Sequence, residues 1–322
     1  MRNLYLGSRY VDPILRAVLL SWNWRLDVII ILLVMGGLYS VGWWRLRKRT
    51  RRARHRRRGP GRHELAARWR LVSYLTGLVF VGLALLSPVD VLGQQLFFMH
   101  MIQHLLLIMI APPLLLIANP MPFILWGLPK KWRLKSGHVI ARLLHREGNF
   151  RHGLRVATGA GVIWLVWTIS VIGWHDPNMY NAALRSEFIH DLEHLTFFAA
   201  SMIFWWLVTG AGPHIHKQFG RFGRVAFVLA AVPPNMALGV VLAFTSVVIY
   251  SYYEAVPRLW GIDPVTDQRI GGVIMWIPGS MMFIIAALIL IAQLLSEEES
   301  KPALSEKEWA SDDALSAPGL KK

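Results

Sequence analysis

The amino-acid sequence predicts an all-α integral membrane protein with seven transmembrane helices, an N-terminus outside the cell and a cytoplasmic C-terminus. Hydrophobic residues make up 54% of the 322 residues, and the mean hydropathy is +0.40. Together with 15 tryptophans, this composition is typical of a membrane protein and not of a soluble domain. The uneven distribution of Lys and Arg between the connecting segments predicts the orientation.

Seven apolar stretches are long enough to cross a bilayer. A spanning helix needs about 20 mostly apolar residues, because lipid offers no partner for a free backbone N–H or C=O group. Each stretch is bounded by charged residues, by Gly or Pro, or by paired aromatic residues, which favour the headgroup region. The predicted spans are 27–44, 71–87, 96–118, 154–174, 188–209, 224–250 and 271–294.

Positively charged residues concentrate in alternate connecting segments. Residues 45–70 hold thirteen Lys and Arg, and residues 119–153 hold seven. The other segments hold few: four in 1–26, none in 88–95, one in 175–187 and two in 251–270. Because cytoplasmic loops carry the excess of Lys and Arg, the N-terminus is predicted outside and the C-terminus inside.

The chain is predicted to form a single membrane domain, residues 27–295, flanked by two shorter segments. Residues 1–26 form an outer segment, in which "VDPILRAVLLSW" fits either a short interfacial helix or an irregular lead. Residues 296–322 are polar and acid-rich, which predicts a disordered cytoplasmic tail. The basic loop 45–70 lies next to a span, so we expect it to contact anionic lipid and not nucleic acid.

Five histidines are predicted at similar depth near the outer side. His100 and His104 lie in the third span, His190 and His194 in the fifth, and His175 just past the outer end of the fourth. Residues at i and i+4 share one face of a helix, so both imidazoles of each pair can point at the same place. Two facing pairs would form a four-imidazole site that suits copper or zinc or, with haem, axial ligation.

Neighbouring polar and sulfur-containing residues complete the candidate site. Gln103, Asp191 and Glu193 are candidates for outer-shell partners that orient the imidazoles, although Gln103 and Glu193 point about 100° away from the histidine that follows each. Met275, at comparable depth in the seventh span, is a weaker candidate ligand, because methionine is also a common packing residue. The chain has no cysteine, so any bound metal must use His, Met and oxygen donors.

Proline interrupts three spans at membrane depth. The breaks are Pro112-Pro113, Pro233-Pro234 and Pro278-Gly279. Such breaks occur where protein or a water-filled cavity satisfies the freed backbone groups, so they indicate either a cavity or simple packing kinks.

Four motifs follow one another within residues 70 to 295: "FFMHMIQHLLLIMIAPPLL", "WHDPNMYNAALRSEFIHDLEHLTFFAASMIFWW", "PPNMALGVVLAFTSVVIYSYY" and "DQRIGGVIMWIPG". They resemble those of the multi-pass CtaG family of bacterial cytochrome c oxidase assembly factors. The resemblance implies a bacterial plasma-membrane protein that helps to mature a haem-copper oxidase, by assisting copper delivery and without enzymatic turnover. It implies His100, His104, His190 and His194 as motif histidines, with His175 and Met275 as further members, and oxidase subunits as partners.

Two other functions remain open from the residues alone. "HDLEH" matches the H-x-x-E-H pattern of zinc hydrolases, in which the glutamate activates a zinc-bound water. The same imidazoles would also serve a haem-binding membrane protein. The sequence does not determine the oligomeric state.

Overall fold

The structure, a computed structural model, describes residues 13–56, 66–145, 148–212, 215 and 220–299. Within these ranges the chain is helical and contains no strand, in agreement with the predicted all-α class. Three parts of the predicted organisation lie outside the described residues: 1–12 of the N-terminal segment, 57–65 of the basic loop and 300–322 of the tail.

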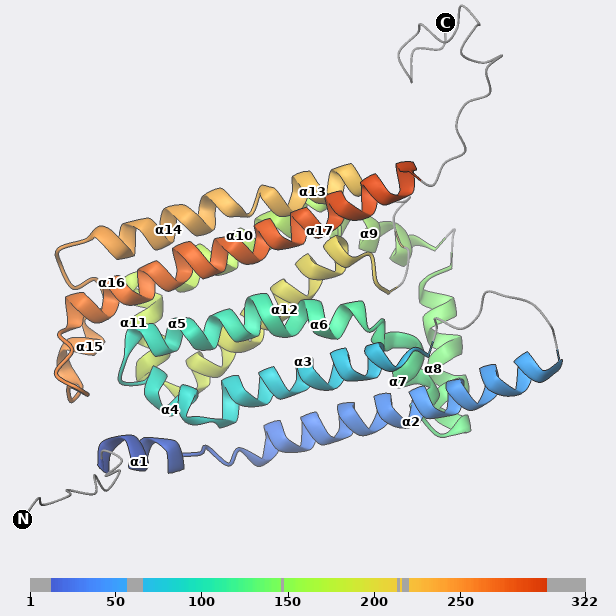
Figure 1. Cartoon of the computed structure of the whole chain (residues 1–322), viewed down its shortest axis with the longest axis horizontal. Helices are drawn as coiled ribbons and strands as arrows, with labels where there is room; N and C mark the ends of the chain where they lie inside the picture. Colours follow the sequence, from blue (N-terminus) through green and yellow to red (C-terminus); the bar gives the residue numbers. More distant parts are fainter. Residues whose placement is uncertain (1–12, 57–65, 146–147, 213–214, 216–219, 300–322) are drawn as a thin grey trace, which may run out of the picture.

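The helices form an elongated bundle (Figure 1). In chain order they are α1 (Pro13–Leu20), α2 (Leu26–Arg56), α3 (Arg68–Leu86), α4 (Pro88–Gly93), α5 (Phe97–Leu105), the π-helical η1 (Leu106–Ile110), α6 (Ala111–Ile117), α7 (Pro120–Gly127), α8 (Lys130–Leu143), α9 (Asn149–Ala157), α10 (Ala160–Trp174), α11 (Pro177–Arg185), α12 (Glu187–Thr209), α13 (Arg221–Leu229), α14 (Val232–Phe244), α15 (Tyr252–Ala255), α16 (Pro264–Ile274), the π-helical η2 (Met275–Gly279) and α17 (Ser280–Glu299).

Six helices or continuous helix runs are long and apolar enough to cross a membrane. They correspond to six of the predicted spans: the first, second, third, fifth, sixth and seventh. The predicted fourth span is divided, because α9 and α10 meet at a bend of 54°. The pair makes a seventh span only if both helices are counted together, so the number seven stays a prediction.

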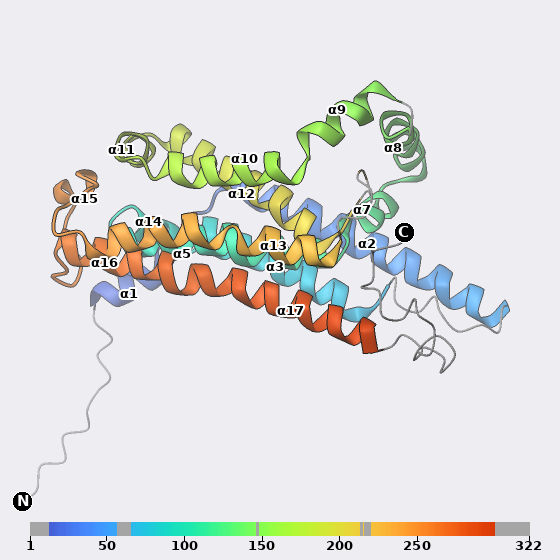
Figure 2. The same cartoon turned by 90° about the horizontal axis from the view of Figure 1, so that it is seen from above.

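The long helices run up and down the bundle, and α1 and the end of α17 lie at opposite ends of it (Figure 1). The short helices α4, α11 and α15 lie at the same end as α1. The basic end of α2 lies at the other end, together with α8 and α9 (Figures 1 and 2). Under the predicted orientation, α1, α4, α11 and α15 would therefore be on the outer side.

The first span is longer than predicted, because α2 continues through the first part of the predicted basic loop. Helix α2 has 31 residues and is about 46 Å long at 1.5 Å per residue, whereas the hydrocarbon core of a bilayer is about 30 Å thick. Lys and Arg are good helix formers, so the charge run does not end the helix. Arg45 also donates from Nη1 to the carbonyl oxygens of Trp126, Gly127 and Leu128 at 2.9, 3.0 and 3.0 Å.

The predicted limits of the last two spans were wrong by several residues. The sixth ends at Phe244 and not at 250, because Thr245 adopts an extended backbone and begins an irregular segment. The seventh begins at Pro264, where the Asp263 carboxylate accepts from the N–H groups of the first turn. Its helix continues through Glu299, into the predicted tail.

Gly239 of α14 and Gly272 of α16 allow these two helices to touch backbone to backbone. A Cβ atom at Gly239 would collide with the backbone of Trp276 and Gly272, and one at Gly272 would collide with the backbone of Leu242 and Ala243. Small residues permit this close approach in membrane helices. The contact fixes α16, which in turn holds the start of α5.

Replacing Gly272 by Val is expected to destabilise the bundle by at least the roughly 1–3 kcal/mol of ordinary overpacking, since backbone and not side chain lies in the way. Thermal unfolding in detergent, followed by tryptophan fluorescence, measures the effect. The matched control is Gly173→Ala in α10, where nothing lies within 4 Å of the new methyl group. An unchanged melting temperature for Gly272→Val would contradict the close contact.

Candidate metal centre

Helix α5 is held in place by a residue from a distant part of the chain. The residue before α5, Leu96, has no side chain that caps the helix. Instead, Asp267 of α16 accepts from the backbone N–H groups of Phe97 and Phe98 at 2.8 and 2.9 Å. Because a cap fixes the first turn of a helix, Asp267 positions His100 one turn further on.

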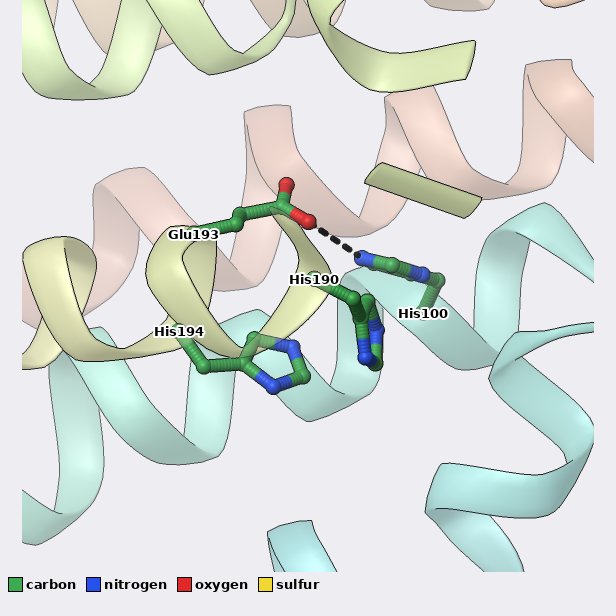
Figure 3. A group of neighbouring side chains, drawn as sticks. All are labelled: His100, His190, Glu193 and His194. Atoms are coloured by element: carbon green, nitrogen blue, oxygen red, sulfur yellow. Dashed lines mark ion pairs between the residues drawn. The ribbon is translucent and has the colours of Figure 1, made fainter. Parts of the chain in front are cut away.

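Helices α5 and α12 bring their histidines together, as the paired spacing predicted. Ligand atoms of His100, His190, Glu193 and His194 all lie within 4.8 Å of one another, and all four residues are buried. Figure 3 shows the Glu193 carboxylate opposite the His100 ring, with the rings of His190 and His194 on the α12 side. We call these four residues the outer cluster.

His104 adjoins the outer cluster without belonging to its four-donor set. Its Nε2 atom lies 2.8 Å from Nε2 of His100 and 3.6 Å from Oε1 of Glu193. His175, which follows α10, has its ring centre 5.9 Å from that of His104. The predicted four-imidazole site is therefore three imidazoles and one carboxylate, with two more imidazoles beside them.

Several buried polar atoms around the outer cluster have no hydrogen-bond partner among the residues that the structure describes. They are Nε2 of His190, Nε2 of His194, Nε2 of His175, Nδ1 of His104 and both carboxylate oxygens of Glu193. Glu193 is 0% exposed, and its nearest cationic candidate is an imidazole 3.6 Å away. Buried polar atoms normally have partners, so this concentration of unpaired lone pairs indicates a place for a cation.

The outer cluster would have to contract slightly around an ion. Ligand nitrogens 2.0–2.1 Å from a tetrahedral metal lie about 3.3 Å from one another. The donor atoms here lie within 4.8 Å of one another, so side-chain rotations that move each atom by about 1 Å would bring them to this spacing. Three imidazoles and one carboxylate are donors that copper and zinc both accept.

The structure separates the three residues predicted as outer-shell partners. Glu193 lies among the donors themselves. Gln103 donates from Nε2 to Asp90 Oδ1 at 2.8 Å and to the Ala84 carbonyl at 2.9 Å. Asp191 forms an ion pair with Arg25, which precedes α2, and is not among the four donors.

Asp90 of α4 was not singled out from the sequence. Its two carboxylate oxygens accept from Gln103 and, at 3.0 Å, from Asn23 Nδ2. It thus ties the chain before α2 to the helix that carries His100 and His104. The only signal in the sequence was an acidic residue in the short segment 88–95, which lacks Lys and Arg.

Aromatic residues that the sequence analysis did not assign cover the outer cluster. The Tyr180 ring of α11 lies 5.1 Å from the His100 ring, centre to centre. Tyr253 donates its hydroxyl proton to the Gly93 carbonyl at 2.8 Å, so the 3.3 Å contact between the two hydroxyls requires Tyr180 to be the donor. Burial raises the pKa of both phenols well above the usual value, so both stay protonated and neutral.

Met275 lies outside the outer cluster. It is buried and packs with Phe97, Met101 and Tyr250. It also lines a small cavity that His104 and His175 border on another side. The structure thus places Met275 on the His104 side of the predicted site.

Comparison with known proteins identifies the family. Residues 37–297 match the cytochrome c oxidase caa3 assembly factor family, Caa3_CtaG. The chain belongs to this family. The match covers the helices that carry every residue of the outer cluster, and it confirms the resemblance inferred from the motifs.

Similar proteins occur in mycobacteria. An uncharacterized protein of Mycobacterium leprae is 27% identical over 265 residues, which are 77% of this chain and 38% of that protein. An uncharacterized protein of Mycobacterium bovis is 23% identical over 333 aligned positions, covering 97% of this chain and 45% of that protein. The chain thus spans less than half the length of these relatives. No solved structure shows a significant match.

Proposed function

We propose that this assembly-factor family member assists copper delivery to a haem-copper oxidase, and that the outer cluster holds the copper. The observation that carries the proposal is the group of unpaired donor atoms on His190, His194 and Glu193, buried beside His100. Leaving such atoms buried without partners is costly, whereas a bound cation would use them all.

The donor set suits copper held as cargo. Imidazole suits copper, and one carboxylate offsets the charge of the ion in a low-dielectric setting. The four donors surround one point within 4.8 Å, which favours a single ion over the plane of a haem. Zinc accepts the same donors, so the metal itself must be measured.

An enzymatic role is less well supported than a carrier role. Glu193 occupies the glutamate position of the H-x-x-E-H pattern, but it is 0% exposed and its side chain lies among the imidazoles. A hydrolase needs its metal-bound water to reach a substrate. An assembly-factor family also favours a role without turnover.

Residues of this chain would control where the ion enters and how it is held. The outer cluster lies in the first turns of α5 and α12, toward the end of the bundle with α4 and α11 (Figure 1). In a bacterial plasma membrane with the predicted orientation, copper would enter from outside. The imidazoles would hold it, and oxidase subunits would receive it by ligand exchange in a membrane complex.

Purified protein is expected to contain copper, at least one ion per chain, with no Soret band. Elemental analysis and an optical spectrum test this, beside a variant in which His100, His104, His190 and His194 are all Leu. The variant should lose the copper, because an apolar residue suits the bilayer but donates nothing. Cells that produce the variant should assemble oxidase deficient in copper but containing haem.

Other results would contradict the proposal in distinct ways. Zinc in place of copper would favour the hydrolase, and a Soret band would favour haem. Full copper content in the variant would mean that the metal binds elsewhere. Oxidase with a normal copper content in cells that produce only the variant would contradict the delivery role.

A further inference from the structure

A small cavity lies beside His104, and none of the four residues of the outer cluster lines it. It is bordered by α5, η1, η2, α10 and α14, and its polar lining residues are His104, His175 and Asn235. Three methionines, Met101, Met109 and Met275, line it as well. We call this space the inner cavity.

Both π-helical segments border the inner cavity. Met109 belongs to η1, and Met275 and Gly279 belong to η2. A π segment shifts the register of a helix and occurs frequently at functional sites. Pro112 and Pro278 lie just after η1 and within η2, so the proline breaks seen in the sequence accompany a cavity in these two spans.

The polar wall contains two imidazoles that each retain a free nitrogen. The Nδ1–H group of His175 donates to the Val171 carbonyl oxygen, 2.7 Å away, while its Nε2 has no partner. His104 uses Nε2 toward His100, while its Nδ1 has none. Asn235 is already engaged, since its Nδ2 donates to the Met275 carbonyl at 2.9 Å.

The size of the inner cavity limits its occupant to an ion or one or two waters. Its volume is about 30 Å³, and about 10–15 Å³ is enough for one water. A water needs two to four polar partners, which the two free imidazole nitrogens barely provide among apolar walls. A soft cation would also use the thioethers, which water does not.

We propose that the inner cavity is a second metal site, which binds Cu(I) through His104, His175 and the thioethers of Met101 and Met275. Thioether donors select Cu(I) over Zn²⁺. His104 touches His100 of the outer cluster at 2.8 Å, so it can exchange a Cu(I) ion between the two sites without any change of oxidation state. This exchange rests on the proposed copper function, whereas the second site does not.

The proposed site is tested with Ag⁺, a redox-inert probe for Cu(I), and Zn²⁺, which avoids thioethers. Wild-type protein in detergent should bind two Ag⁺ and one Zn²⁺ per chain in isothermal titrations. The Met101→Leu/Met275→Leu double variant keeps the side-chain volume. In it, the affinity of one of the two Ag⁺ sites should fall at least tenfold, whereas Zn²⁺ binding should be unchanged. The matched control is Met281→Leu in α17, whose side chain is 52% exposed and remote from the cavity lining.

A second variant separates this proposal from the copper function of the outer cluster. His190→Leu/Glu193→Gln should lose Zn²⁺ and one Ag⁺ but retain the other Ag⁺, with sulfur neighbours in its X-ray absorption spectrum. Wild-type Ag⁺ binding by the double methionine variant would overturn the second site, as would a spectrum without sulfur. If wild-type protein binds no Zn²⁺ or copper at the outer cluster but one sulfur-ligated Ag⁺, the delivery proposal fails and the inner site stands.

Discussion

A chain carrying Glu193→Gln is expected to lose copper affinity by at least about 100-fold while keeping its fold. Glu193 supplies the only carboxylate among the four converging donors, and its two oxygens have no other hydrogen-bond partner in the described part of the chain. An amide has nearly the same shape but no charge to offset that of the ion. In a low-dielectric interior such a charge interaction is far stronger than in water. Competition with a chromophoric copper chelator measures the affinity.

The matched control for this change is Asp191→Asn, two residues away on α12. Asp191 pairs with Arg25 and is not one of the four converging donors, so we expect copper affinity to change less than about threefold. An equal loss in both variants would show that general charge, and not direct ligation, controls binding. Wild-type affinity in Glu193→Gln would remove Glu193 from the donor set.

Acidification is expected to release copper from the outer cluster. A proton and a metal ion compete for the same imidazole lone pair, so each imidazole that takes up a proton on release weakens binding about tenfold per pH unit where it titrates. A higher proton concentration favours the metal-free state, so copper affinity falls as the pH falls. Equilibrium titration with the same chelator between pH 7.5 and 5.5 measures the slope.

The pH experiment needs a control for the integrity of the bundle. Circular dichroism at both pH values should show unchanged helix content, so that loss of copper is not loss of fold. A copper affinity that rises as the pH falls would contradict imidazole ligation. A loss of helix content with the copper would assign the effect to unfolding instead.

The fold class and most of the spans follow from local rules that act along a single helix. Apolar length, helix-breaking residues and terminal charge act over 20 residues or fewer, so they are visible in the sequence. The errors lie at the ends, where distant residues intervene. Arg45 binds the carbonyl groups at the end of α7, a contact between distant parts of the chain that no pattern near residues 45–56 shows.

The candidate site was only partly predictable, for the same reason. The i, i+4 spacing placed His100 with His104 and His190 with His194, because helix periodicity fixes which side chains share a face. Periodicity along one helix does not predict which side chains of the neighbouring helix lie opposite to it. The sequence therefore placed Glu193 in a supporting role, whereas packing of α5 against α12 brings it among the donors.

The sequence by itself determined an all-helical chain of membrane composition, the two histidine pairs and the family to which their motifs belong. Each of these depends on residues close together in the chain. Only the tertiary structure decided which atoms converge: Asp267 caps α5 from α16, Asp191 turns toward Arg25, and Met275 meets His104 and His175 across a cavity. These contacts join residues far apart in sequence, and they depend on helix rotation and packing, which no local pattern encodes.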